Sequence, residues 1–81
     1  MRAQEVKDLI EKALPGALVE VEDQTGTGDH FGAVVVSPAF AGKMLVQRHQ
    51  LVYGALGSLV GGPIHALALK TWTPEEAASR R

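Results

Sequence analysis

A chain of 81 residues with a formal net charge of −1 has room for one domain with a modest hydrophobic core, predicted here as a single domain over residues 1–81. Hydrophobic residues make up 46% and charged residues 21%, which excludes disorder, and near-zero charge disfavours tight non-specific nucleic-acid binding. No cysteine is present, so disulfide scaffolds and thiol chemistry are excluded, and metal binding would depend on His30, His49 and His65.

The first half of the chain predicts a helix followed by a β-hairpin. Residues 2–14 have apolar side chains at three- and four-residue spacing, and Pro15-Gly16 ends this helix. Residues 17–22 alternate between apolar and polar, as a half-buried strand does. Residues 30–36 are rich in β-branched side chains and predict a second strand. The glycine-containing segment 23–29 between them predicts an antiparallel hairpin.

The second half predicts a helix, a strand and a short final helix. Pro38 ends the second strand, and after an irregular segment a helix spans about residues 44–59. Its apolar stripe contains Leu45, Val52, Leu56 and Leu59. Gly61-Gly62-Pro63 interrupts the regular secondary structure, and residues 64–72 form a third strand. Thr73 then caps a short helix that ends in a tail.

Two glycines in the second predicted helix each weaken it by up to about 1 kcal/mol relative to alanine. We therefore expect another element to pack closely against Gly54 and Gly57. The order helix, strand, strand, helix, strand, helix predicts an α+β fold with helices on one face of a three-stranded sheet.

Several motifs in this order resemble the BolA family over nearly the whole chain. These motifs include Asp29-His30-Phe31, Arg48-His49 and the strand sequence from Ile64 to Thr71, and their common order makes the match specific. Further segments that carry the resemblance are residues 19–23, 34–37, 40–43, 45–47, 52–53 and 73–75. The resemblance implies a class II KH-like domain of αββαβα order, which agrees with the elements predicted above.

The same resemblance implies a function without catalysis. Proteins of this family pair with monothiol glutaredoxins and share a bridging 2Fe–2S cluster, which serves iron regulation or cluster trafficking. The glutaredoxin cysteine and glutathione supply two thiolates, and the BolA-like partner supplies two ligands. By position in the motifs, these ligands are here His65 and His30, and no cofactor is expected in the isolated chain.

The residues alone leave other roles open for these histidines. A lone histidine on an apolar strand is more often a hydrogen-bonded structural residue, and one beside a turn is more often solvated. His49 falls on the apolar side of the second helix, where a structural or partner-contact role for Arg48-His49 fits better than metal ligation. With two imidazole ligands, the cluster would have a raised reduction potential and would bind less strongly at low pH, when imidazole is protonated.

DNA binding is the main alternative, since members of the resembled family are described as transcriptional regulators of stress response and cell morphology. Lys43, Arg48 and Lys70 would form a local basic patch together with Arg80 and Arg81 if the fold gathers them. The sequence Gly54-Ala-Leu-Gly57 matches the GxxG pattern of the loop with which KH domains bind a nucleic-acid backbone. However, it falls inside the predicted helix and has no basic residues beside it.

Other functions have less support in the sequence. The loop Thr25-Gly-Thr-Gly-Asp29 lacks the lysine of a phosphate cradle and leads into a strand. Glu20, Glu22 and Asp23 are more typical of a solvated strand face than of a catalytic pair. A third possible function is that of a protein-interaction module whose histidines never bind metal. No apolar run approaches about 20 residues, so we expect no membrane segment. We expect a cytoplasmic protein because the N-terminal residues do not resemble a signal peptide, and a monomer because the apolar core is small and no coiled-coil repeat is present.

Overall fold

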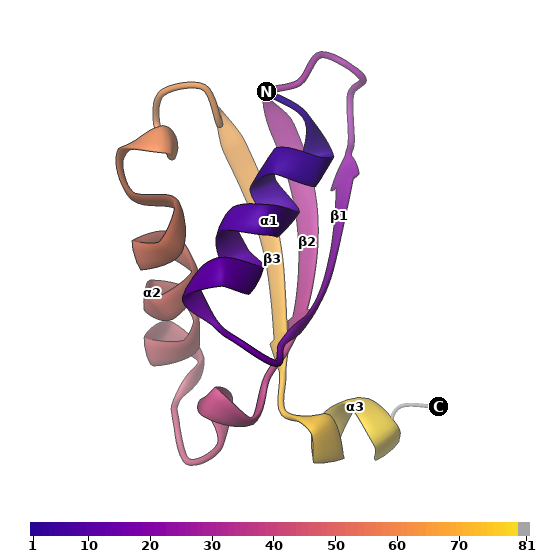
Figure 1. The fold of residues 1–81 in the computed structure, drawn as a ribbon, viewed down its shortest axis with the longest axis vertical. Coiled ribbons are helices and arrows are strands. Elements are labelled where there is room, and N and C mark those ends of the chain that lie inside the picture. Colours follow the sequence, from indigo (N-terminus) through magenta and orange to yellow (C-terminus); the bar gives the residue numbers. More distant parts are fainter. Residues whose placement is uncertain (80–81) are drawn as a thin grey trace.

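The computed structural model describes residues 1–79 and shows an α+β arrangement of helices over a sheet (Figure 1). The predicted basic residues Arg80 and Arg81 lie outside the described residues. The elements in chain order are α1 (Ala3–Ala13), β1 (Leu18–Asp23), β2 (His30–Val36), the 3-10 turn Pro38–Phe40, α2 (Leu45–Leu56), the 3-10 turn Gly57–Leu59, β3 (Ala66–Trp72) and α3 (Pro74–Ser79).

Within the described part of the chain, the sheet has three strands in the order β1-β2-β3. β1 and β2 form the predicted antiparallel hairpin, with Leu18 opposite Val36 and Asp23 opposite Phe31. β3 runs parallel to β2, and its first residue, Ala66, pairs with His30. The parallel pairing brings the starts of β2 and β3 to the same end of the sheet.

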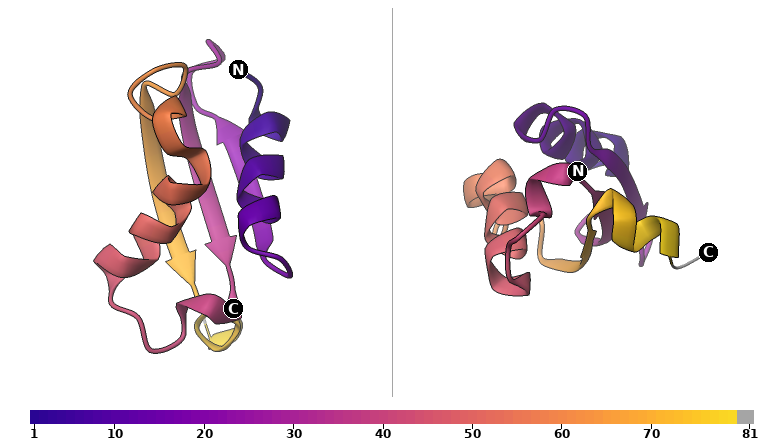
Figure 2. Two further views of the ribbon diagram at one scale, coloured as in Figure 1. Left: turned by 60° about the vertical axis from the view of Figure 1, so that its left-hand side comes forward. Right: turned by 90° about the horizontal axis from the view of Figure 1, so that it is seen from below.

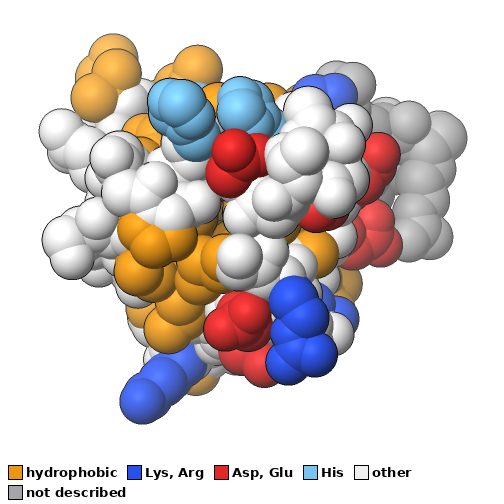
Figure 3. All heavy atoms as spheres, turned by 90° about the horizontal axis from the view of Figure 1, so that it is seen from above, with side chains coloured by type: hydrophobic (Ala, Val, Ile, Leu, Met, Phe, Trp, Pro, Cys, Tyr) orange, Lys and Arg blue, Asp and Glu red, His pale blue; other side chains and the backbone are white. Residues whose placement is uncertain are grey.

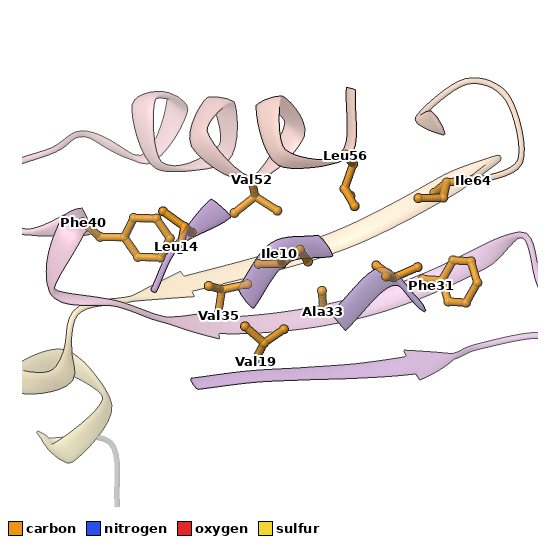
Figure 4. Packing of buried hydrophobic residues seen from close by; sticks show 11 residues of the cluster. Ile10, Leu14, Val19, Phe31, Ala33, Val35, Phe40, Val52, Leu56 and Ile64 are labelled. Atoms are coloured by element: carbon orange, nitrogen blue, oxygen red, sulfur yellow. The ribbon is translucent and has the colours of Figure 1, made fainter. Parts of the chain in front are cut away.

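Helices α1 and α2 lie side by side on one face of the sheet (Figure 2). Alternate residues of the central strand β2 point toward them, and Phe31 and Val35 are fully buried. The helices contribute side chains that are equally inaccessible, among them Ile10 and Val52 (Figure 4). The short α3 lies beyond the end of β3, and none of the described helices is long and apolar enough to cross a membrane.

Helix α2 differs from its prediction at both ends. Leu45 is 60% exposed and does not belong to the buried stripe, because the first turn of α2 lies away from the sheet (Figure 2). The α-helix ends at Leu56 rather than residue 59, because Gly57 takes a positive φ of 58° that an α-helix cannot contain. A tighter 3-10 turn carries the chain on to Leu59.

The expectation of close packing against the two helix glycines is wrong. A Cβ atom built on Gly54 or on Gly57 would meet nothing within 4 Å. Gly57 is explained instead by its backbone conformation. The third strand also begins later than predicted: Ile64 is buried and forms an isolated bridge with Val60, and regular pairing starts at Ala66.

Candidate metal centre

Two histidines that are far apart in the sequence meet at one end of the sheet. His30 is the first residue of β2, and His65 directly precedes β3. Because these strands are parallel and in register at this point, their starts are neighbours. The centres of the two imidazole rings are 5.4 Å apart, with 51° between the ring planes, and histidine side chains gather on this surface (Figure 3).

The histidine pair lies at the surface and outside the core. The side chain of His30 is 39% exposed, and His65 is an exposed residue. The sequence pattern predicts His65 inside a third strand over residues 64–72, on the same face as Leu67. The structure instead places it before the strand, where strand alternation does not hold its side chain against the core.

A third residue, Asp29, joins the two segments that carry the histidines. The Nδ1 atom of His30 lies 2.7 Å from the Oδ1 atom of Asp29. The backbone carbonyl of Asp29 accepts hydrogen bonds from the amide of His65 at 2.7 Å and from the amide of Ala66 at 3.2 Å. The hydroxyl of Thr27 donates to the same carboxylate. Hydrogen bonds from Thr27 and then from His30 hold the pKa of Asp29 below its ordinary value.

The loop before His30 has a defined shape. The carboxylate of Asp23 accepts the amide hydrogens of Gly26 and Gly28, each at 2.9 Å. Both glycines have positive φ angles, 74° and 78°, which side chains other than glycine rarely adopt. A Cβ atom on Gly28 would also lie 2.8 Å from the carbonyl oxygen of Met1. These contacts hold the loop in one arrangement as it enters β2.

The spacing of the imidazoles fits two ligands of one metal ion. A metal–nitrogen bond is about 2.0–2.1 Å long, so two imidazoles at a tetrahedral angle have ring centres roughly 5 Å apart. Among residues 1–79, no three histidine or carboxylate side chains are grouped so that they could hold a metal ion. A metal ion held by this pair would therefore need further ligands from outside residues 1–79.

The other predicted residues lie elsewhere, mainly around a groove between α2 and β3. This groove of about 280 Å³ is lined by Arg48, His49 and Lys70, together with Leu45, Leu69, Thr71, Trp72 and Glu76. His49 packs edge-on against Tyr53, with ring centres 6.4 Å apart. Within the described residues, the buried atoms His49 Nε2 and Thr71 Oγ1 have no hydrogen-bond partner.

Arg48 is held by a salt bridge. Its Nη1 and Nη2 atoms donate to the two carboxylate oxygens of Glu76 at 2.6 and 3.2 Å. Its Nε atom donates to the carbonyl of Lys43 at 3.0 Å. The structure thus brings Lys43 and Arg48 together through the Lys43 backbone. The guanidinium of Arg48 already has a carboxylate partner inside the chain.

Sequence reasoning assigned no role to Asp29, which entered it as part of the motif Asp29-His30-Phe31 and as the end of a glycine-rich loop. Its position directly before His30 was the one available signal. Its contact with His65 depends on strand pairing across the sheet, which sequence spacing does not show.

The fold and the site define a class II KH-like α+β domain that presents two converging histidines at one end of its sheet. The family model described as "BolA-like protein" matches residues 10–76. The chain belongs to the BolA family.

Three relatives illustrate the similarity. Human BolA-like protein 1 is 36% identical over 78 residues, which cover 88% of this chain and 57% of the human protein, so the chain spans little more than half of that relative. A BolA homologue from Coxiella burnetii has a solved structure with a TM-score of 0.82 and 43% identity, covering 96% of this chain and 97% of that one. The Escherichia coli protein named "DNA-binding transcriptional regulator BolA" is 30% identical over 83 residues, covering 94% of this chain and 79% of that protein.

Proposed function

We propose that this chain is the partner of a monothiol glutaredoxin and supplies His65 and His30 as two ligands of a shared 2Fe–2S cluster. The glutaredoxin cysteine and glutathione supply the thiolate ligands, and the chain itself catalyses no reaction. The observation that carries the proposal is the 5.4 Å separation of the two imidazoles at an exposed end of the sheet. Imidazole is a good ligand for iron, and histidine replaces cysteine on one iron in Rieske-type clusters.

The surroundings of the pair support a shared site rather than a closed one. Both histidines are accessible, so a partner can approach them. The pair offers only two of the four terminal ligands that a 2Fe–2S cluster takes, so a second molecule would supply the other two. We place this function in the cytoplasm, where the thiols of glutaredoxin and glutathione stay reduced. We expect an isolated monomer that forms a one-to-one complex.

The test is a titration of the chain into a glutaredoxin that carries its cluster with glutathione, followed by visible absorption and circular dichroism. The wild-type chain should change the spectrum and form a one-to-one complex. His65→Ala and His30→Ala should each lose that change. His49→Ala is the control for loss of an imidazole away from the cluster: the mixed complex should keep its wild-type spectrum, and a partner-contact role of His49 would appear only as a lower affinity.

An unchanged spectrum with the wild-type chain would contradict the proposal. Binding of equal affinity with and without the cluster, insensitive to both histidine substitutions, would instead identify a plain protein-interaction module.

DNA binding is the second candidate function, and the α2–β3 groove is the observation that favours it. Lys70 and Arg48 line this groove together with His49. The name of the Escherichia coli relative agrees with such a role. Within residues 1–79 of the predicted basic patch, Arg48 is paired with Glu76, whereas Lys43 and Lys70 form no salt bridge and could contact phosphate.

DNA binding is tested by measuring affinity at several salt concentrations. Lys70→Gln should weaken binding and reduce the slope of log affinity against log salt by about 1, the effect of losing one phosphate contact. Lys12→Gln on α1 is the control for a change of net charge alone. Absence of binding at low salt, or equal effects of the two substitutions, would exclude the groove as a DNA site.

A further inference from the structure

Asp29 contacts both histidine-bearing segments at once, through two different groups. We infer that Asp29 is a positioning residue: its carboxylate orients His30 so that Nε2 is the ligating nitrogen, and its backbone carbonyl holds His65 beside it. The histidine pair is then preformed in the isolated chain. This inference rests on the proposed function and deepens it.

The side-chain contact fixes which ring nitrogen carries the proton. A carboxylate at neutral pH can only accept hydrogen bonds. The 2.7 Å contact between Asp29 Oδ1 and His30 Nδ1 therefore requires the proton on Nδ1. In the neutral ring, Nε2 then has the free lone pair that a metal needs. Carboxylate–histidine pairs of this kind orient metal ligands and raise their basicity.

The backbone contact fixes the second histidine. The carbonyl oxygen of Asp29 accepts from the amides of His65 and Ala66, at 2.7 and 3.2 Å. These bonds extend the parallel pairing of β2 and β3 by one residue beyond the strands. His65 thus begins its strand at a fixed position relative to His30. A substitution of the Asp29 side chain leaves this backbone contact available.

Asp29 is itself held in place. The hydroxyl of Thr27 donates to its carboxylate, and the loop around Thr27 is shaped by the bonds from Gly26 and Gly28 to Asp23. A preformed pair binds more tightly than one that must be ordered on binding, because the entropic cost of ordering is already met. The positioning residue thus affects affinity for the shared cluster without touching it.

The first test uses the isolated chain and needs no cluster. Nitrogen NMR of uniformly 15N-labelled protein, at a pH where the imidazoles are neutral, reports which ring nitrogen of each histidine carries the proton. Wild-type His30 should be the Nδ1–H form, and Asp29→Ala should shift it to the Nε2–H form. The tautomer of His49, in the α2–β3 groove, is the internal control and should not change.

Asp29→Asn is the conservative variant. Its side-chain oxygen keeps the shape and an acceptor but lacks the charge, so the Nδ1–H form should be partly retained. Hydrogen exchange of the His65 amide should stay slow in both variants, because its acceptor is a backbone carbonyl. A His30 tautomer that is the same in the wild type and in Asp29→Ala would overturn the inference.

The second test is a double-mutant cycle on the complex with cluster-loaded glutaredoxin. Asp29→Ala should weaken the mixed complex on the order of 10–100-fold, the usual effect of losing a hydrogen-bond partner of a metal ligand. In a His30→Ala background the same substitution should have almost no further effect, because it acts through His30. An equal loss in both backgrounds would show a general effect on the loop and contradict the inference.

The two proposals fail in different ways. If His30→Ala and His65→Ala form mixed complexes with the same spectrum as the wild-type chain, the proposed function fails. The tautomer measurement on the isolated chain separately decides whether Asp29 orients His30.

Discussion

At the scale of single residues, Arg48 and His30 show that a side chain's partner determines what it can do. Arg48 looks like a phosphate-binding residue in the sequence. In the structure its side chain is 13% exposed and forms a bidentate pair with Glu76, which links α2 to α3. His30 looks like a solvated residue beside a turn. Its contact with Asp29 instead orients it beside a second imidazole.

The Arg48–Glu76 pair predicts a pH-dependent contribution to stability. Hydrogen bonds from Arg48 and from the backbone of Thr73 hold the pKa of Glu76 below its ordinary value of 4.5. A carboxyl whose pKa is lower in the folded than in the unfolded state stabilises the fold above its unfolded pKa. This stabilisation is lost as the pH falls through its folded pKa.

Glu76→Gln should therefore lower the free energy of unfolding at pH 7, with a difference from the wild type that shrinks as the pH falls through the carboxyl range. Denaturant unfolding at pH values between 7 and 3 measures that difference. Glu75→Gln, in the same turn of α3, is the control and should show a smaller pH dependence. A difference that stays constant over this range would exclude the ion pair as its cause.

At the scale of elements, α2 combines a buried end and an open end. Leu56 in its last turn is 3% exposed and packs in the core, whereas Leu45 in its first turn is 60% exposed beside the groove. The two leucines have the same chemistry and sit in the same helix. Their difference in burial comes from the distance between each end of the helix and the sheet.

This difference predicts unequal costs for the same substitution. Leu56→Ala should lower the free energy of unfolding by about 2–5 kcal/mol, because it leaves a cavity in the core. Leu45→Ala should change it by no more than about 0.5 kcal/mol, as expected for an exposed position. Chemical denaturation of both variants tests this, and equal losses would contradict the observed position of the first turn of α2.

The two glycines of α2 give a second matched pair. Gly54 has helical conformation and open space around it, so Gly54→Ala should stabilise the chain by roughly 0.5–1 kcal/mol. Gly57 has a positive φ, so Gly57→Ala should destabilise it by roughly 1–2 kcal/mol. Thermal unfolding of both variants should shift in opposite directions. A loss of stability in Gly54→Ala would mean that a neighbour does approach that position.

At the scale of the whole molecule, the core and the candidate metal centre are separate. The core fills the space between the sheet and the helices α1 and α2 (Figure 4). The histidine pair lies at the end of the sheet where β2 and β3 begin. The site can therefore be altered without removing the contacts that hold the fold together.

The double variant His30→Ala/His65→Ala should unfold with nearly the wild-type free energy, within about 0.5 kcal/mol, because both side chains are accessible. It should at the same time lose the spectral change with cluster-loaded glutaredoxin. Circular dichroism of the isolated variant and the titration measure the two properties. A large loss of stability would show that the imidazoles also support the fold.

The sequence by itself determined the element order, the hairpin and the half-buried pattern of β1, because hydrophobic periodicity reports which side of an element is buried. It also supplied the family motifs that contain His30 and His65. Only the tertiary structure decided that these two histidines meet, that Asp29 connects them and that Arg48 binds Glu76. Each of these contacts joins segments far apart in the chain, and periodicity within one element carries no information about which elements become neighbours.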